Sequence, residues 1–262
     1  MAVDKVMNVI RRKLAFGLVA LVMGLGTQTG VAQAQDAASI LKLAFDNWRA
    51  DSSFARVQMT IKRATGTRNL TMESWTQGSD KALVRFVKPA RDAGNATLQL
   101  GSQTYVFNPK LNQVIKLPAS ALSQSWMGSD FSYEDLSRSE KIITDYTHKL
   151  LSTKSVGGKK VYVIESTPIK GKPIVWGKQI VSVRSDGVLV SIAYYDQVGK
   201  RVRIMSADKI STIGGRPYPT VMTMRRDGKP GLFTRITTLS AKFDLAIPKY
   251  IFTRSNLQNP RN

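Results

Sequence analysis

Residues 118–136 read PASALSQSWMGSDFSYEDL and interrupt a chain that otherwise alternates between apolar and polar side chains. Gly128 suits a sharp turn within this segment. Beyond it, Ser132 can cap a short helix while Asp135, three residues later, reaches back toward the cap. We therefore predict an apolar loop that runs into a short capped helix and covers another part of the fold.

On both sides of this segment, apolar residues recur at every second position. Val57, Met59 and Ile61 alternate with polar residues, as in a half-buried β-strand. The pattern predicts about ten or eleven strands, separated by turn pairs such as Asp186-Gly187. Residues 36–50 carry apolar side chains at helical spacing instead. A large antiparallel sheet must curl or close to protect its edges, so we expect an α+β protein, mainly antiparallel β, folded as a barrel or half-barrel.

The inward-facing positions of the first strands are apolar and form the candidate ligand-binding set: Val57, Met59, Ile61, Leu70, Met72, Val84 and Phe86. The same residue types can form a filled core or line a cavity. A half-barrel of this size has more interior than its own side chains fill, which favours a cavity. The candidate lid or portal residues are Trp126, Met127, Phe131, Tyr133 and Leu136. The alternative for these five is packing that merely fixes the loop.

The composition excludes several chemistries. The chain has 262 residues, no Cys and one His, so it can form neither a disulfide, a thiolate metal site or a cysteine nucleophile nor a histidine metal cluster. His148 lacks the surroundings of a catalytic triad and is expected to be a surface or strand residue. The acids at 130, 134 and 135 fit helix capping better than acid–base chemistry. We expect no enzyme activity, no metal and no cofactor.

The net charge of +21 indicates an attraction to anions. Basic residues on predicted strand faces are Lys62, Arg63, Arg68, Arg201, Arg203, Arg225 and Arg226. They can form a surface for transient contact with anionic lipid headgroups or an acidic partner, or simply a solvated outer face. Nucleic acid is not expected as a partner, because no docking motif accompanies the charge and the chain carries an export signal.

The first 34 residues are typical of a cleavable signal peptide. Basic residues, the last of them Lys13, precede an apolar run over residues 14–26, and Ala32-Gln33-Ala34 follows. The run is too short for a typical membrane span, although an uncleaved anchor is the alternative. We predict cleavage near Ala34, export to the periplasm and a single domain over residues 35–262. Without Cys, the protein is not a lipoprotein.

The segment MGSDFSYEDL at residues 127–136 resembles the signature of the outer-membrane lipoprotein-sorting-like proteins, the LolA-like family. The order of helix, basic-alternating strand, signature loop and hairpins extends this resemblance over nearly the whole mature chain. It implies an unclosed antiparallel β-barrel with helices forming a lid over a hydrophobic cavity, as in LolA, LolB, LppX and RseB-type domains. By location, Arg56 and Arg63 are candidates for a lid-gating arginine.

Two functions follow as hypotheses from this resemblance. The first is a periplasmic carrier or chaperone that binds the acyl chains of a lipid or lipoprotein for transfer between membranes, with an inner-membrane lipid-exporting pump and an outer-membrane acceptor as expected partners. The second is a lipid-sensing or interaction domain of the RseB type that regulates a protein partner. The sequence allows both and does not specify the cargo.

Overall fold

The computed structural model describes residues 29–137, 141–172 and 174–261. Its helices are α2 (Thr29–Arg49), α3 (Tyr133–Ser137), α4 (Lys141–Asp145) and α5 (Arg254–Gln258), with 3-10 turns at Ala119–Ala121, Trp126–Gly128 and Lys249–Phe252. The strands are β1 (Ser52–Arg63), β2 (Gly66–Gln77), β3 (Lys81–Lys88), β4 (Ala96–Leu100), β5 (Gln103–Asn108), β6 (Gln113–Lys116), β7 (Tyr146–Val156), β8 (Lys159–Pro168), β9 (Lys178–Arg184), β10 (Leu189–Tyr195), β11 (Arg201–Ile213), β12 (Arg216–Arg226) and β13 (Phe233–Phe243).

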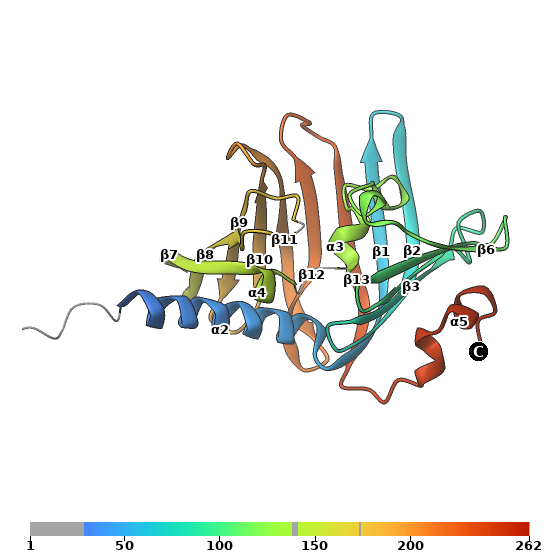
Figure 1. The fold of residues 1–262 in the computed structure, drawn as a ribbon, viewed down its shortest axis with the longest axis horizontal. Helices are drawn as coiled ribbons and strands as arrows, with labels where there is room; N and C mark the ends of the chain where they lie inside the picture. The colour runs from blue at the N-terminus through green and yellow to red at the C-terminus, as the bar shows by residue number, and fades with distance from the viewer. Residues whose placement is uncertain (1–28, 138–140, 173, 262) are drawn as a thin grey trace, which may run out of the picture.

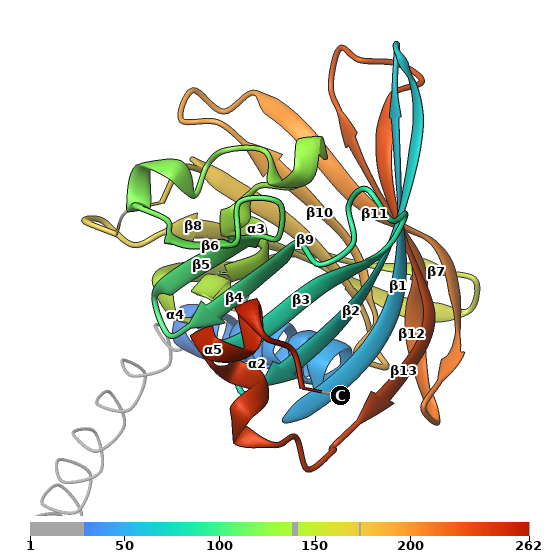
Figure 2. The ribbon, with the colours of Figure 1, turned by 90° about the vertical axis from the view of Figure 1, so that its right-hand side faces the viewer.

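All of these strands belong to one antiparallel sheet, in the order β6-β5-β4-β3-β2-β1-β13-β12-β11-β10-β9-β8-β7. Strand β1 pairs with β13, so the first and last strands of the chain meet in the middle of the sheet. The sheet curls strongly (Figure 2), yet its edges β6 and β7 do not pair with each other. The predicted α+β architecture with an unclosed half-barrel is therefore confirmed.

The described sheet has thirteen strands, more than the ten or eleven predicted. Strand β7 does not show in the alternation pattern because most of its residues are exposed at the sheet edge, including Lys149, Leu151 and Lys154. Charged residues at an edge also discourage pairing with another chain. The inward side of β7 mixes Tyr146 and Leu150, which pack on the core, with the polar His148, so its sequence carries no strong period of two.

Helix α2 fills one half of the concave side of the sheet, where it lies across β7 to β12 (Figure 1). Its residues Ala37, Leu41 and Phe45 are buried in a core shared with the strand residues Ile164, Val181, Val183, Met205, Met222 and Met224. The predicted helix over residues 36–50 is confirmed, and it begins earlier, at Thr29.

The predicted Asp186-Gly187 hairpin connects β9 to β10 and lies against α2. Gly187 has a φ of +78°, and a Cβ there would meet Leu43 and Asn47 of the helix at 3.2–3.3 Å. Glycine is therefore needed for both the turn and the close approach of the helix.

The C-terminal segment covers the opposite, convex face of β3 to β5 (Figure 2). Ile247, Ile251, Phe252 and Leu257 from this segment pack on the outward side chains Leu83, Leu98, Tyr105 and Phe107. The concave face of the same strands is left to the segment that interrupts the alternation.

The predicted signal peptide lies mainly in residues 1–28, outside the described residues. Within the described ranges, helices fall short of the length or apolar character that crossing a membrane requires.

Candidate functional site

A cavity of about 230 Å³ lies between the concave face around β1 and the interrupting segment, residues 118–136, which we call the cover segment. Most of its wall comes from strands β1 to β5 and β13. Its lining residues are Trp48, Arg49, Ser53, Ala55, Val57, Met72, Ser74, Thr76, Ala82, Val84, Thr97, Gln99, Thr104, Trp126, Phe131, Asp135, Leu136, Tyr218, Ile236 and Thr238. The cover segment therefore does lie over another part of the fold.

The structure divides the seven candidate ligand-binding residues into two groups. Val57, Met72 and Val84 line the cavity. The other four, Met59, Ile61, Leu70 and Phe86, are buried beside the cavity, and all seven belong to one apolar cluster with Trp126. These four support the cover segment from below.

The candidate lid residues divide in the same way. Trp126, Phe131 and Leu136 line the cavity, whereas Met127 and Tyr133 pack on the neighbouring apolar cluster. Trp126 is 2% exposed, its ring centroid lies 5.2 Å from that of Phe86, and its indole N–H donates to Thr97 Oγ1 over 3.2 Å. One aromatic side chain thus fixes the cover segment to β3 and β4.

The predicted capped helix is α3, and its cap is confirmed. The carboxylate of Asp135 accepts hydrogen bonds from the Ser132 backbone N–H at 2.8 Å and from its hydroxyl at 3.0 Å. In return, the Ser132 hydroxyl accepts from the Asp135 N–H. This reciprocal pattern satisfies backbone donors at the helix start. The structural interpretation of Asp135 is therefore confirmed.

Asp130 attaches the cover segment to the rim of the half-barrel. This carboxylate is buried and lies 3.0 Å from both the Arg63 and the Arg226 guanidinium groups. It also accepts from Thr234 Oγ1 at 2.8 Å, and the Asp130 N–H donates back to the same hydroxyl. Arginines from two hairpins and a threonine from β13 thus converge on one loop residue.

Arginines from the β1–β2 hairpin hold the backbone turn before Asp130. Met127 and Gly128 both adopt left-handed conformations, with φ of +53° and +74°. Such a φ is unfavourable for Met, and the surrounding structure must stabilise it. The Met127 carbonyl accepts from Arg68 at 3.1 Å and the Gly128 carbonyl accepts from Arg63 at 3.0 Å. Of the two gate candidates, Arg63 touches the cover segment, whereas Arg56 is exposed.

The expectation that Arg203 belongs to an outward basic face is wrong, because this side chain is buried. It is 4% exposed, and its guanidinium lies 2.6 Å from Asp135 and donates to the Asp130 carbonyl at 2.8 Å. It also lies over the rings of Trp176 and Tyr194. Burial is the largest single influence and lowers the pKa of Arg203, but the interactions with Asp135, Tyr194 and Asp130 together raise that pKa above its ordinary value. Arg203 is thus an internal cation that holds α3.

Most of the remaining residues of the expected basic face are also ion-paired. Arg68 meets Asp92, Arg201 meets Asp227, and Arg225 meets Asp208, while Lys62 is exposed and lies 6.0 Å from the Phe233 ring centroid. These arginines stabilise loops and strand pairs as well as facing solvent.

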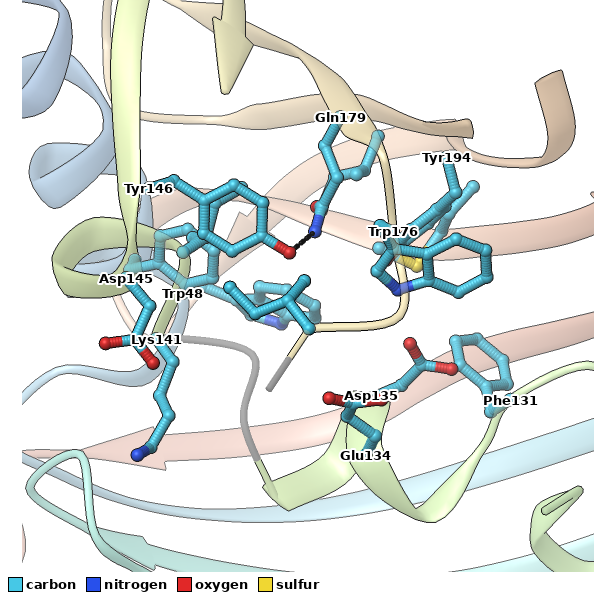
Figure 3. A pocket seen from close by; sticks show the side chains of 15 residues that line it. Trp48, Phe131, Glu134, Asp135, Lys141, Asp145, Tyr146, Trp176, Gln179 and Tyr194 are labelled. Atoms are coloured by element: carbon cyan, nitrogen blue, oxygen red, sulfur yellow. Dashed lines mark hydrogen bonds between the residues drawn. The ribbon is translucent and has the colours of Figure 1, made fainter. Parts of the chain in front are cut away.

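A second, smaller cavity of about 80 Å³ adjoins the first one and faces the α2 half (Figure 3). Trp48, Phe131 and Asp135 line both cavities and therefore stand between them. Gln179 donates to the hydroxyl of Tyr146 at 2.9 Å, and burial raises the pKa of that hydroxyl to about 12. The small cavity is lined by aromatic rings together with Glu134, Lys141 and Asp145.

His148 is a strand residue, as one alternative predicted, but it is buried rather than on the surface. Its Nδ1 lies 3.0 Å from Ser166 Oγ. Burial lowers its pKa, which favours the neutral ring. Across the described ranges, no group of three or more Asp, Glu or His side chains is arranged to hold a metal ion.

Sequence reasoning missed the polar part of the cavity wall. Ser53, Ser74, Thr76, Thr97, Gln99 and Thr104 all line the cavity. The period-two pattern contains the signal, because counting back from Val57 by twos reaches Ser53, and counting on from Met72 reaches Ser74 and Thr76. The candidate set contains the apolar members of each strand only.

Comparison with solved structures defines the class of fold. A protein described as an outer membrane lipoprotein-sorting domain, from Vibrio parahaemolyticus, aligns with a TM-score of 0.75 at 22% identity, over 86% of this chain and 99% of its own. A DUF1329 family protein from Desulfovibrio piger gives 0.77 at 22% identity over 86% and 99%. A LolA superfamily protein from Nitrosomonas europaea gives 0.70 at 24% identity over 84% and 98%.

The chain therefore has the LolA-type unclosed barrel, and the resemblance noted in its sequence is confirmed. A family model for a group of uncharacterized proteins matches residues 78–259, and the chain belongs to that family. No curated protein matches this chain.

Proposed function

We propose that this protein is a periplasmic carrier or chaperone that shelters the acyl chains of a lipid or lipoprotein during transfer between membranes. It acts by binding alone, without enzyme chemistry, metal or cofactor. The observation that carries the proposal is the 230 Å³ cavity, walled by Val57, Met72 and Val84 and covered by a segment that is attached at the barrel rim.

The cavity volume supports partial occupation in the observed form. An apolar cavity of about 150 Å³ is large enough for benzene. The cavity here, at about 230 Å³, has room for a short part of an acyl chain. Binding a whole chain then requires the cover segment to move outward.

The contacts of the cover segment suit such a movement. Its rim contacts are largely ion pairs, and the side chains of Arg63 and Arg226 are 29% and 43% exposed, so water can replace those contacts. The driving force is apolar burial. Transfer of a chain of about fourteen methylenes from water into an apolar site is favourable by roughly 11 kcal/mol, before the costs of binding are subtracted. Directional transfer therefore needs a donor and an acceptor that bias this exchange.

The partners that fit this role are an inner-membrane lipid-exporting pump as donor and an outer-membrane acceptor. Exposed basic residues such as Lys62, Lys149 and Lys154 favour transient contact with an anionic membrane surface. With export by a signal peptide that ends near Ala34, the protein acts between the two membranes.

The test is transfer of a fluorescent acylated lipid from donor vesicles to acceptor vesicles by mature protein. Val84→Asp puts a carboxylate into the cavity wall, and Val156→Asp makes the same change at an exposed edge position. We expect the wild type and Val156→Asp to accelerate transfer and folded Val84→Asp to lose most of this activity. Equal transfer by all three would contradict the proposal. Lipid binding without transfer, together with lipid-dependent capture of a protein partner, would favour a sensor instead.

A further inference from the structure

The cavity is polar at one end and apolar at the other. Strand pairing brings five lining residues into one continuous row across the sheet: Ser53 pairs with Thr76, Thr76 with Ala82, Ala82 with Gln99, and Gln99 with Thr104. All five line the cavity. We call them the polar row, because four of them carry a hydroxyl or an amide.

The next rows change in character step by step. The second row contains Ala55, Ser74, Val84 and Thr97. The third contains Val57, Met72 and Phe86, and the Phe86 ring packs on Trp126 of the cover segment. Within one cavity, the wall thus passes from hydroxyls to hydrocarbon toward Trp126.

Three members of the polar row are buried, and the other two, Thr76 and Ala82, are half-buried. Ser53, Gln99 and Thr104 are 7%, 4% and 2% exposed. Ser53 and Thr76 share a hydrogen bond of 2.7 Å between their hydroxyls. Thr104 Oγ1, by contrast, is buried and has no hydrogen-bond partner among the described residues. A buried hydroxyl left without a partner is unfavourable, and valine would fill the same space without that cost. A ligand group that bonds this hydroxyl would offset the cost.

Two charged side chains line the cavity, Arg49 and Asp135. Arg49, four residues before Ser53, lines the cavity together with Tyr218. Burial raises the pKa of Tyr218 to about 12, while hydrogen bonds from Trp48 and Thr238 and the positive charge of Arg49 oppose the rise. The wall's carboxylate, Asp135, lies in α3 and has its charge balanced by Arg203 at 2.6 Å. Arg49 is therefore the cation of the cavity wall.

We propose that the cavity binds a single-chain amphiphile with its head at the polar end, so that the acceptor oxygens of a carboxylate or phosphate head contact the polar row and Arg49 and the alkyl chain extends toward Trp126. This inference rests on the proposed lipid-binding function and specifies the cargo class. Hydroxyls and a guanidinium all donate hydrogen bonds, and anionic oxygens are the strongest acceptors for them.

The test measures binding of dodecanoate, dodecyl phosphate and dodecanol to the mature protein by displacement of a fluorescent apolar probe. Wild type is expected to bind the two anions about tenfold more tightly than the alcohol, because hydrogen bonds to charged groups are stronger. Thr104→Val should weaken the better anion about tenfold and weaken dodecanol less. The carboxylate and phosphate arms decide which anionic head fits better.

Thr153→Val, at an exposed position of β7, is the matched control and should leave all three affinities unchanged. Thr104→Val without ligand should unfold at the same temperature as wild type or a higher one, which separates a binding role from a structural role. If dodecanoate and dodecanol bind equally and Thr104→Val matches Thr153→Val, the proposal that the head contacts the polar row is wrong while the lipid-binding proposal stands. If none of the amphiphiles displaces the probe from the wild type, the proposed function itself fails.

Discussion

The two halves of the concave face are both built from strands with alternating apolar residues, but one half is a filled core and the other contains a larger cavity. Under α2, the side chains of Leu41 and Phe45 fill the space above β7 to β12, and a small cavity of about 80 Å³ remains. Under the cover segment, Trp126 and Phe131 leave about 230 Å³ above β1 to β5. The strand pattern alone does not decide between core and cavity.

The difference comes from how each cover is attached. Helix α2 has a long apolar stripe that packs on the concave face of the sheet. The cover segment buries one large side chain, Trp126, in the apolar cluster beside the cavity, and its other apolar side chains on this cluster are only partly buried. Polar contacts of Asp130 and Asp135 with arginines at the rim and in the interior also hold it. A cover attached at its border leaves space beneath it, and we expect that it can be released without disrupting the sheet.

The largest difference in the free energy of unfolding is expected between two leucine truncations, one in each half. Leu41→Ala removes a fully buried side chain from the filled half and should lower the free energy of unfolding by about 2–5 kcal/mol. Leu136→Ala removes a half-buried side chain at the cavity wall and should cost about 1 kcal/mol or less. Urea denaturation of both variants measures the difference, and equal losses would show that the cavity half is packed as a core.

A second pair of variants adds side-chain volume to each half instead of removing it. Val181→Phe adds volume to a site with no exposed surface and should destabilise the protein by about 1–3 kcal/mol or more. Val84→Phe can extend into the cavity, so we expect little loss of stability but weaker probe binding. Thermal unfolding and probe titration test the pair. Destabilisation of Val84→Phe to the same extent as Val181→Phe would argue against free space at that wall.

Releasing the rim contact should have a moderate effect. Asp130→Asn weakens the contacts with Arg63 and Arg226 and should cost about 1–3 kcal/mol in the free energy of unfolding, since the carboxylate is buried but its partners are partly exposed. The rate of probe uptake in stopped-flow experiments should rise. Asp227→Asn, which loses an exposed pair with Arg201, is the control and should cost about 0–1 kcal/mol with no change in uptake. Unchanged uptake in Asp130→Asn would remove the rim contact from any role in opening.

Acidification should act on the filled half and give the smallest effect. Burial lowers the pKa of His148 in the folded state below its unfolded value of 6.5. The unfolded chain therefore binds the proton more readily, and the destabilising contribution is absent above about pH 6.5 and grows as pH falls toward the folded pKa. Between about pH 7 and about pH 5.5, the wild type should lose more stability than His148→Gln, as measured by urea denaturation. Parallel losses in both proteins would contradict this role of His148.

Much of the fold could be predicted because its signals are local. The period of two, the Asp186-Gly187 turn and the Ser132–Asp135 cap each depend on neighbouring residues, and all three are present. The edge strand β7 escaped prediction because its inward face mixes Tyr146 and Leu150 with the polar His148, and residues 153–156 are exposed. Its existence depends on pairing with β8, which is a tertiary property.

The candidate site was predictable in outline but not in detail. Alternation identifies which side chains face inward, yet it does not tell that Phe86 lies beneath Trp126 while Val84 borders open space. Arg203 is expected on the surface because arginine is rarely buried. Only the tertiary fold brings Asp135, Trp176 and Tyr194 around it, and these contacts stabilise the buried charge.

The most direct test of the account is native mass spectrometry with lipid extraction on mature protein purified from the periplasm, for the wild type, Val84→Asp and Val156→Asp. We expect about one bound acylated molecule on the wild type and on Val156→Asp, and none on correctly folded Val84→Asp. A wild-type protein that stays free of lipid even after incubation with lipid vesicles, or a Val84→Asp protein that retains it, would contradict the claim that the space beneath the cover segment is an acyl-chain site.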